Sequence, residues 1–290
     1  EAVVEAEVEK RAVEVDQHCI DLIPVRIRRC HAGIIGAVPT AGSASMVPNP
    51  HDLLHEVVAI ARAAGRAVLQ VYASSFAIAE KSDRSPLTEA DLRSQEVISA
   101  GLRRVAPEIP VLSEEAEQTP FAERSHWDWL WVVDPLDGTK EFLKQNGEFT
   151  VNLALIHQGR PVAGFISVPV KGLFYSAVKG QGAFKVEIGE QRGASQNERQ
   201  IKQNKQGHWL QLRAAEFCMD DPGLTVLASR SHFDSETRKF IESLNEPRLE
   251  SRGSSLKFMM LAEGRGHLYP RLGRTMEWDT AAGQAILEEA

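Results

Sequence analysis

A run of apolar, β-favouring residues that ends in two aspartates constrains this chain more than any other feature. Residues 129–133 read Trp-Leu-Trp-Val-Val, which predicts a buried strand. An Asp-Pro pair follows at 134–135, and because proline cannot donate to a central ladder, we expect the strand to end there. Asp-Gly at 137–138 predicts a turn, and a short helix should follow with Thr139 as its N-cap. Carboxylates and a hydroxyl are therefore expected at the carboxyl end of a buried strand, where α/β folds place their ligands.

Two acidic side chains at the end of an apolar strand need a compensating charge. A lone Asp-Gly-Thr would be explained by a turn and a helix cap. Two unit charges about 4 Å apart, however, repel by roughly 4 kcal/mol at an effective dielectric constant near 20. Either one carboxyl group stays protonated or a cation offsets the repulsion. The strand contains no Arg or Lys, so a hard divalent cation is the simplest answer, and oxygen ligands suit Mg²⁺.

The net charge, the cysteine spacing and the apolar runs of the chain limit the kinds of partner and compartment that fit it. The 290 residues carry a formal net charge of -7, which disfavours a nucleic-acid polymer as partner and suits a metal-assisted site for a small anionic substrate. Cys19, Cys30 and Cys218 are far apart and form no CxxC pair, which favours a reducing, cytoplasmic compartment without structural zinc. No apolar run is long enough to span a membrane, although peripheral association with the inner membrane face stays open, as does the oligomeric state.

Alternating helical and strand patterns predict a layered α/β fold. Helices are expected where apolar residues recur at helical spacing behind capping signals, at 49–72, 88–102, 234–244, 254–263 and from 278 onward. Strands are expected in short β-favouring runs, at 110–113, 149–157, 162–168, 173–178 and 224–228. Residues 81–86 are expected to form a loop, and 158–160 a hairpin turn.

Three motifs that occur in a fixed order resemble a known family. Ser-Glu-Glu at 113–115, Asp-Pro-Leu-Asp-Gly-Thr at 134–139 and Trp-Asp-Thr-Ala-Ala at 278–282 are similar to the inositol-monophosphatase-like, lithium-sensitive phosphatase superfamily. The segments that favour its 3'(2'),5'-bisphosphate nucleotidase branch are 140–142, 146–150, 229–232 and 253–258. The resemblance runs from about Leu53 to Ala290 and implies an α/β fold, a layered α-β-α-β-α sandwich.

The resemblance also implies a metal site. Two or three Mg²⁺ ions would be held by Glu114, Asp134, the carbonyl of Leu136, Asp137 and Asp279. Taken alone, Asp279 would be a carboxylate favoured at the start of a helix, and Glu114 an exposed charge after a strand. Their joint occurrence with the central motif favours the metal site instead.

Three catalytic roles follow from the same resemblance. Thr139 would hold the attacking water, Glu114 would accept its proton, and Asp91 would support the same water. Asp91 also fits a capping box with Thr88, and both roles can hold at once. The amide groups of Gly138 and Thr139 are suitable phosphate donors.

Substrate contacts are expected in the second half of the chain. By resemblance, Ser254 and Lys257 hold the 5'-phosphate, Arg271 lies nearby and His232 lies beside the adenine. The plainer alternatives are an N-cap for Ser254, a surface charge for Lys257 and a loop position for His232. The remaining substrate contacts would come from the metal-site segment and the last helix, through Glu114, Leu136, Asp137, Gly138, Thr139 and Asp279.

The function implied is a Mg²⁺-dependent phosphatase that converts adenosine 3',5'-bisphosphate to AMP and phosphate, and acts on its sulfated form, within sulfur assimilation. Direct attack by water is expected, without a covalent enzyme intermediate. The alternatives are an inositol monophosphatase and a non-catalytic fragment that binds nucleotide or metal. A covalent aspartyl-phosphatase usually carries Asp-x-Asp-Gly-Thr, whereas two residues separate the aspartates at 134 and 137 here, which counts against that mechanism.

Four segments are expected along the chain. Residues 1–45 have no counterpart in the family and should form a disordered extension before Met46. Residues 46–184 would form an N-terminal α+β metal-binding part, and 185–222, rich in Gln, Asn and Lys, a variable surface insertion. Residues 223–290 would form a C-terminal α/β substrate-binding part, which lacks the family's final strands.

Overall fold

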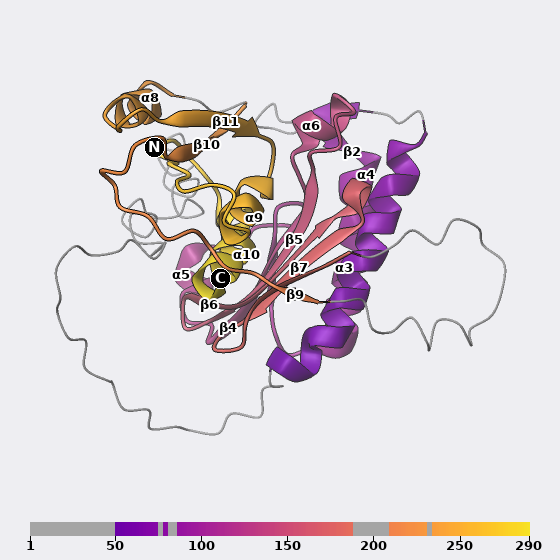
Figure 1. Ribbon diagram of the computed structural model, residues 1–290. Coiled ribbons are helices and arrows are strands. Elements are labelled where there is room, and N and C mark those ends of the chain that lie inside the picture. Colours follow the sequence, from indigo (N-terminus) through magenta and orange to yellow (C-terminus); the bar gives the residue numbers. More distant parts are fainter. Residues whose placement is uncertain (1–49, 75–77, 81–85, 188–208, 231–233) are drawn as a thin grey trace, which may run out of the picture.

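A seven-stranded sheet, in the order β3-β4-β5-β6-β7-β8-β9, organises the fold (Figure 1). The computed structural model describes residues 50–74, 78–80, 86–187, 209–230 and 234–290. β3 is parallel to β4, and every later pair is antiparallel. The strands are β3 (Val111–Ser113), β4 (Trp129–Asp137), β5 (Thr150–His157), β6 (Arg160–Val168), β7 (Leu173–Val178), β8 (Gly182–Glu187) and β9 (Leu210–Gln211).

Two long helices, α3 (Pro50–Tyr72) and α4 (Glu89–Val105), cover one face of this sheet (Figure 1). Their apolar residues recur at helical spacing, so each helix has one buried side. That side packs on every second residue of the central strands, which point to the same face. The shared core contains Val57, Ala61, Ala64, Val68, Ile98, Leu102, Trp131, Val133, Leu153, Leu155 and Phe165.

Two further helices, α9 (Leu256–Ala262) and α10 (Glu277–Glu289), pack on the opposite face. The alternate residues of the strands, including Val132, Ala154 and Ile166, join them in a second core. Leu227 belongs to the same core and comes from β10 (Thr225–Ser229), which pairs in parallel with β11 (Arg248–Arg252). α9 and α10 therefore lie between two sheets.

The last layer is α8 (Ser235–Glu242), which lies beyond β10 and β11 (Figure 1). The resulting order is helices, sheet, helices, sheet, helix, which confirms the layered α/β prediction. The other elements are short: β1 (Ile78–Glu80), β2 (Pro86–Thr88), α5 (Phe121–Arg124), α6 (Thr139–Leu143) and the 3-10 turn η1 (Pro169–Lys171). None of the helices in the described ranges is both long and apolar enough to cross a bilayer.

Most predicted elements are confirmed within a few residues, but two predictions about the central motif are wrong. The strand that begins at Trp129 does not end at Asp134; it continues to Asp137. Its pairing with β5 shifts register between Asp134 and Asp137, so Pro135 lies at an irregularity where no ladder donor is needed. Thr139 is not the N-cap of α6 but its first residue; Gly138, with φ of 92°, is the cap.

The polar segment at 185–222 also differs from the prediction. Residues 185–187 complete β8, and 210–211 form β9 at the edge of the main sheet. Leu212 and Phe217 are buried. These residues therefore pack on the described fold, and the sequence did not predict it because isolated apolar residues in a polar context show no period. Residues 188–208, like 1–49, lie outside the described residues.

The strands β1, β2 and β11 were also not expected. β11 has the sequence Arg-Leu-Glu-Ser-Arg, which shows no apolar face, and it forms only because β10 lies beside it. β1 and β2 form a small antiparallel pair, so Pro86 begins a strand instead of ending the predicted loop. Residues 81–85 of that loop lie outside the described residues.

Candidate active site

Three aspartates converge where β4 ends and α10 begins. Asp134, Asp137 and Asp279 each offer one carboxylate oxygen, and these three oxygens lie within 4.8 Å of one another. Asp134 and Asp137 come from the irregular end of β4, and Asp279 from the first turn of α10. Asp279 is about 140 residues from the other two aspartates along the chain. It reaches them because α10 packs on the main sheet.

Asp134 is the most buried of the three carboxylates, at 1 % exposure. Burial raises its pKa well above the ordinary value, and the nearby charges of Glu114, Asp137 and Asp279 raise it further. The Leu136 N–H donates to Asp134 Oδ1 at 3.1 Å and opposes this rise. The largest charge effects on Asp134 therefore all come from other carboxylates, so the ionised site is short of positive charge.

Asp279 is held by its own helix start. Its Oδ2 accepts from the Thr275 hydroxyl and from the Met276 N–H, both at 3.0 Å, so the carboxylate caps the start of its own helix. Burial first, and then the charge of Asp137, raises the pKa of Asp279 to about 6. The helix-start role and a ligand role are compatible, because these two bonds engage one oxygen of the carboxylate.

Glu114 lies beside the three aspartates but is not one of the groups whose oxygens gather within 4.8 Å. It follows β3, and its backbone N–H donates to the Val133 carbonyl at 3.2 Å. The parallel pairing of β3 with β4 therefore places it next to the end of β4. Its charge raises the pKa of both Asp134 and Asp279, which reflects this proximity.

Asp91 and Thr139 face each other across the site. The Thr139 hydroxyl lies 3.4 Å from Asp91 Oδ1 and 3.3 Å from the Leu136 carbonyl oxygen. The other Asp91 oxygen, Oδ2, accepts from the Thr88 N–H at 2.7 Å and from its hydroxyl at 2.6 Å. Asp91 therefore completes the predicted capping box and reaches the site with its second oxygen.

A further bond fixes α4 against this loop: the Ser94 hydroxyl donates to the Pro135 carbonyl at 2.7 Å. Both groups are buried, so the bond is shielded from water. The turn at Gly138 is equally close-packed, because a Cβ there would lie 3.1 Å from the Glu148 carbonyl and 3.1 Å from Ser254 Cβ. The loop that carries Ser254 thus closes directly over Gly138.

Lys257 is a buried residue and not the surface charge of the plainer interpretation. Only 4 % of it is exposed, and its Nζ donates to the Ser254 carbonyl at 2.5 Å and to the Arg252 carbonyl at 3.3 Å. The Nζ also lies 5.1 Å from the centre of the Tyr269 ring. Burial lowers the pKa of Lys257 to about 8, opposed by the charge of Asp137 and aided by that of Arg271.

Ser254 and Arg271 lie close to this lysine. Ser254 is not a helix cap: it precedes the cap position, has φ of 45°, and its Oγ is buried without a hydrogen-bond partner among the described residues. Arg271 donates from Nη2 to the Arg274 carbonyl at 2.9 Å, and its Nε is buried and unpartnered in the same described part. His232, the fourth predicted substrate contact, lies outside the described residues.

Ser255 is a site residue that was not predicted from the sequence. Its N–H and hydroxyl donate to Asp137 Oδ2 at 2.6 Å and 2.8 Å. The same oxygen lies 3.3 Å from the Thr150 hydroxyl and 3.3 Å from the Asn152 amide nitrogen. A serine before an apolar helix looks like a cap in the sequence, so only the fold, which places α9 against β4, shows its partner.

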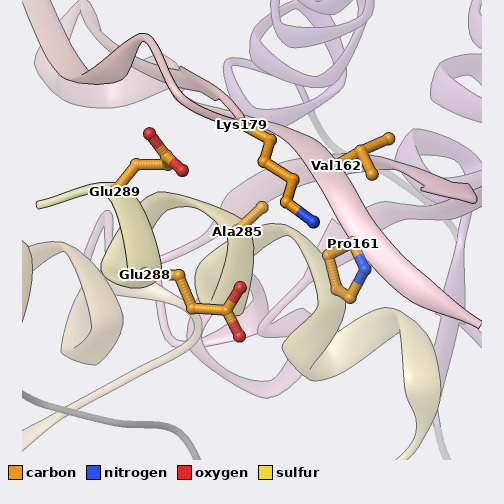
Figure 2. Close-up of a pocket in the computed structure, with 6 residues that line it drawn as sticks. All are labelled: Pro161, Val162, Lys179, Ala285, Glu288 and Glu289. Carbon is orange, nitrogen blue, oxygen red and sulfur yellow. The ribbon is translucent and has the colours of Figure 1, made fainter. Parts of the chain in front are cut away.

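Figure 2 shows a pocket that is separate from the aspartates. It lies at the far end of α10, ten residues or about 15 Å along the helix from Asp279. Glu289, one of its residues, is already engaged, because its carboxylate accepts from the N–H groups of Gly180 and Gly182 at 2.9 Å each. The lining residues are Pro161, Val162, Lys179, Ala285, Glu288 and Glu289.

Comparison with known proteins shows the family to which the chain belongs. The sequence model of the inositol monophosphatase family matches residues 49–290. The 3'(2'),5'-bisphosphate nucleotidase CysQ of Shigella flexneri is 45% identical over 240 residues, which cover 82% of this chain and 88% of that protein. The corresponding protein of Salmonella typhimurium is 46% identical over 236 residues, covering 81% of this chain and 86% of its own.

A solved structure shows the same fold. CysQ from Bacteroides thetaiotaomicron, described as a bacterial member of the inositol monophosphatase family, superposes with a TM-score of 0.66 at 40% identity. The match covers 82% of this chain and 87% of that one. From the family match and from these relatives, we conclude that the chain belongs to the inositol monophosphatase family.

Proposed function

We propose that this chain is a metal-dependent 3'(2'),5'-bisphosphate nucleotidase. It removes the 3'-phosphate of adenosine 3',5'-bisphosphate to give AMP and phosphate, and it acts in the same way on the sulfated nucleotide of sulfur assimilation. The relatives named above support this reaction. The observation that carries the proposal is the meeting of three carboxylate oxygens within 4.8 Å, beside the Asp91–Thr139 pair.

The donor set fits magnesium. All three gathered side chains offer oxygen, the ligand atom that Mg²⁺ prefers. Burial, and then repulsion between the acidic groups, raises the pKa of Asp134 and Asp279, and a divalent cation would oppose this rise. We assign two or three Mg²⁺ ions to Glu114, Asp134, the Leu136 carbonyl, Asp137 and Asp279. When bound, the ions supply positive charge to the attacking and leaving oxygens of the phosphoryl transfer.

The chain's own groups orient the attacking water. The Thr139 hydroxyl directs its proton toward Asp91 Oδ1 or the Leu136 carbonyl, which leaves an oxygen lone pair to accept a hydrogen bond from water. Glu114, which follows β3 and lies beside Asp134, is assigned as the acceptor of the water's second proton. Gly138 and Thr139 at the start of α6 are assigned as donors to the phosphate oxygens.

The second phosphate is assigned to the loop before α9. Ser254 offers a buried hydroxyl without a partner among the described residues, and the Lys257 ammonium lies beside it. An unpaired buried hydroxyl is costly unless a ligand satisfies it. Arg271 lies close enough to alter the charge state of Lys257 and is assigned to the same phosphate, and His232 to the adenine. An inositol monophosphate would leave these groups unused.

A substrate panel tests this function. Phosphate release from adenosine 3',5'-bisphosphate should require Mg²⁺, fall with added Li⁺ and be lost in Asp137→Asn. The change Ser243→Ala, at the exposed residue that follows α8, should have no effect. Faster turnover of inositol 1-phosphate would identify an inositol monophosphatase instead. Nucleotide binding by calorimetry without any phosphate release would identify a non-catalytic binding protein.

A further inference from the structure

Ser255 joins three elements of the site through one side chain. It occupies the cap position before α9, and its hydroxyl lies 2.8 Å from Asp137 Oδ2 on β4. The Asn152 amide of β5 donates to the same hydroxyl at 2.9 Å, and the Asp279 carbonyl oxygen of α10 lies 3.5 Å away. Ser255 and Asn152 are 2 % and 1 % exposed, so water does not compete for these bonds.

The hydroxyl is not used for helix capping. A serine at this position commonly accepts from a backbone N–H of the first turn. Ser255 has φ of -67° and ψ of 0°, which is helical, and makes no side-chain cap bond. Its single proton goes to the nearer acceptor, Asp137 Oδ2, and its lone pair accepts from Asn152. The side chain is thus committed to the aspartate and not to its own helix.

All the hydrogen bonds that Asp137 accepts from Ser255, Thr150 and Asn152 go to one of its oxygens, Oδ2. Oδ2 accepts from the N–H of Ser255 at 2.6 Å and from its hydroxyl at 2.8 Å, with the Thr150 and Asn152 donors at 3.3 Å. A carboxylate oxygen has two lone pairs, so these bonds saturate Oδ2. Oδ1 accepts no hydrogen bond from the described residues and keeps its lone pairs for a ligand.

We propose that Ser255 is a positioning residue for the metal site: it orients the Asp137 carboxylate so that Oδ1 faces the ion. This inference rests on the metal-dependent function proposed above. Groups that hold a metal ligand in place commonly change metal affinity by about 10- to 100-fold when they are removed. Ser255 acts on the ion through Asp137, whereas its neighbours Ser254 and Lys257 are assigned to the substrate.

The test measures metal binding apart from turnover. Mn²⁺, which takes the same oxygen ligands, is titrated into the metal-free enzyme and followed by electron paramagnetic resonance, and Mg²⁺ is measured by its displacement. Ser255→Ala should weaken binding of both ions by about 10- to 100-fold. The KM for the nucleotide at saturating Mg²⁺ should stay near the wild-type value, and Ser243→Ala should bind both ions normally.

Two variants of equal shape distinguish the effect of the Ser255 hydroxyl from the effect of side-chain packing. Ser255→Thr keeps the hydroxyl, and Ser255→Val has the same shape without it, so strain from the added bulk is common to both. The proposal requires tighter Mn²⁺ binding by the threonine variant. Equal binding by the pair, or wild-type binding by Ser255→Ala, would overturn it. If the wild type binds Mn²⁺ in a Ser255-dependent way but releases no phosphate from the nucleotide, the proposed function fails and the positioning role stands.

Discussion

The guanidinium of Arg124 faces the carboxylate of Glu277 with both terminal nitrogens: Nη1 donates to Oε1 at 2.9 Å, and Nη2 lies 2.9 Å from Oε2. The Arg124 side chain is only 4 % exposed. Glu277 is the first residue of α10, two positions before Asp279. Arg124 belongs to α5, in the segment that follows Glu114. The ion pair therefore ties together the two segments that bring Glu114 and Asp279 to the site.

Removing one partner of this pair should destabilise the fold strongly. Arg124→Met leaves the Glu277 carboxylate without its partner, which costs about 3 to 5 kcal/mol for a buried pair. The free energy of unfolding in urea should fall by an amount near the lower limit, because Glu277 is 25 % exposed. Arg124→Lys keeps the charge and should recover part of the loss. A change below about 1 kcal/mol would show that the pair behaves as a surface ion pair.

The pKa of Asp279 makes the stability of the metal-free protein depend on pH. In the folded state this carboxyl keeps its proton up to about pH 6, whereas the unfolded chain loses it near 3.8. The folded state therefore binds the extra proton between these values, and stability falls as the pH rises from about 4 to about 6, by about 3 kcal/mol in all. Urea unfolding in EDTA across this range measures the slope, which should flatten in Asp279→Asn.

Binding of Mg²⁺ should restore the stability that the metal-free protein loses as the pH rises. Above pH 6 Asp279 loses its proton, and Mg²⁺ offsets the negative charge that this adds to the aspartate cluster, so the rise in Tm on adding Mg²⁺ should be larger at pH 8 than at pH 5. The raised pKa of Asp134 acts in the same direction. A rise in Tm that is equal at both pH values would show that the metal does not bind these carboxylates.

Lys257 should set an alkaline limit to substrate binding. Burial lowers its pKa to about 8, so the free enzyme loses this positive charge as the pH rises through 8. The KM for adenosine 3',5'-bisphosphate should increase above that pH, and Lys257→Met should show a high KM that no longer changes there. Adenosine 3'-monophosphate, which lacks the second phosphate, is the control. Its KM should be insensitive both to the substitution and to this pH range.

The sequence predicted those parts of the site that depend on local pattern. The capping box of Thr88 and Asp91 and the strand that begins at Trp129 need only neighbouring residues, and both are confirmed. Ser255 and the Arg124–Glu277 pair join elements more than 100 residues apart, so no local pattern identifies them. β11 was not predicted because its residues are mostly polar, and they form a strand through pairing with β10.

Gly138 should tolerate no side chain, for two separable reasons. Its φ of 92° costs a residue with a Cβ about 1 to 2 kcal/mol, and that Cβ would lie 3.1 Å from both the Glu148 carbonyl and Ser254 Cβ. Gly159 is the matched control, because its φ is 73° and nothing lies within 4 Å of an added Cβ. Gly159→Ala should lose only the backbone part of the unfolding free energy and keep full activity. Gly138→Ala should lose more stability, and its kcat should fall because the displaced turn carries Asp137; equal effects of the two changes would show that the contact over Gly138 is unimportant.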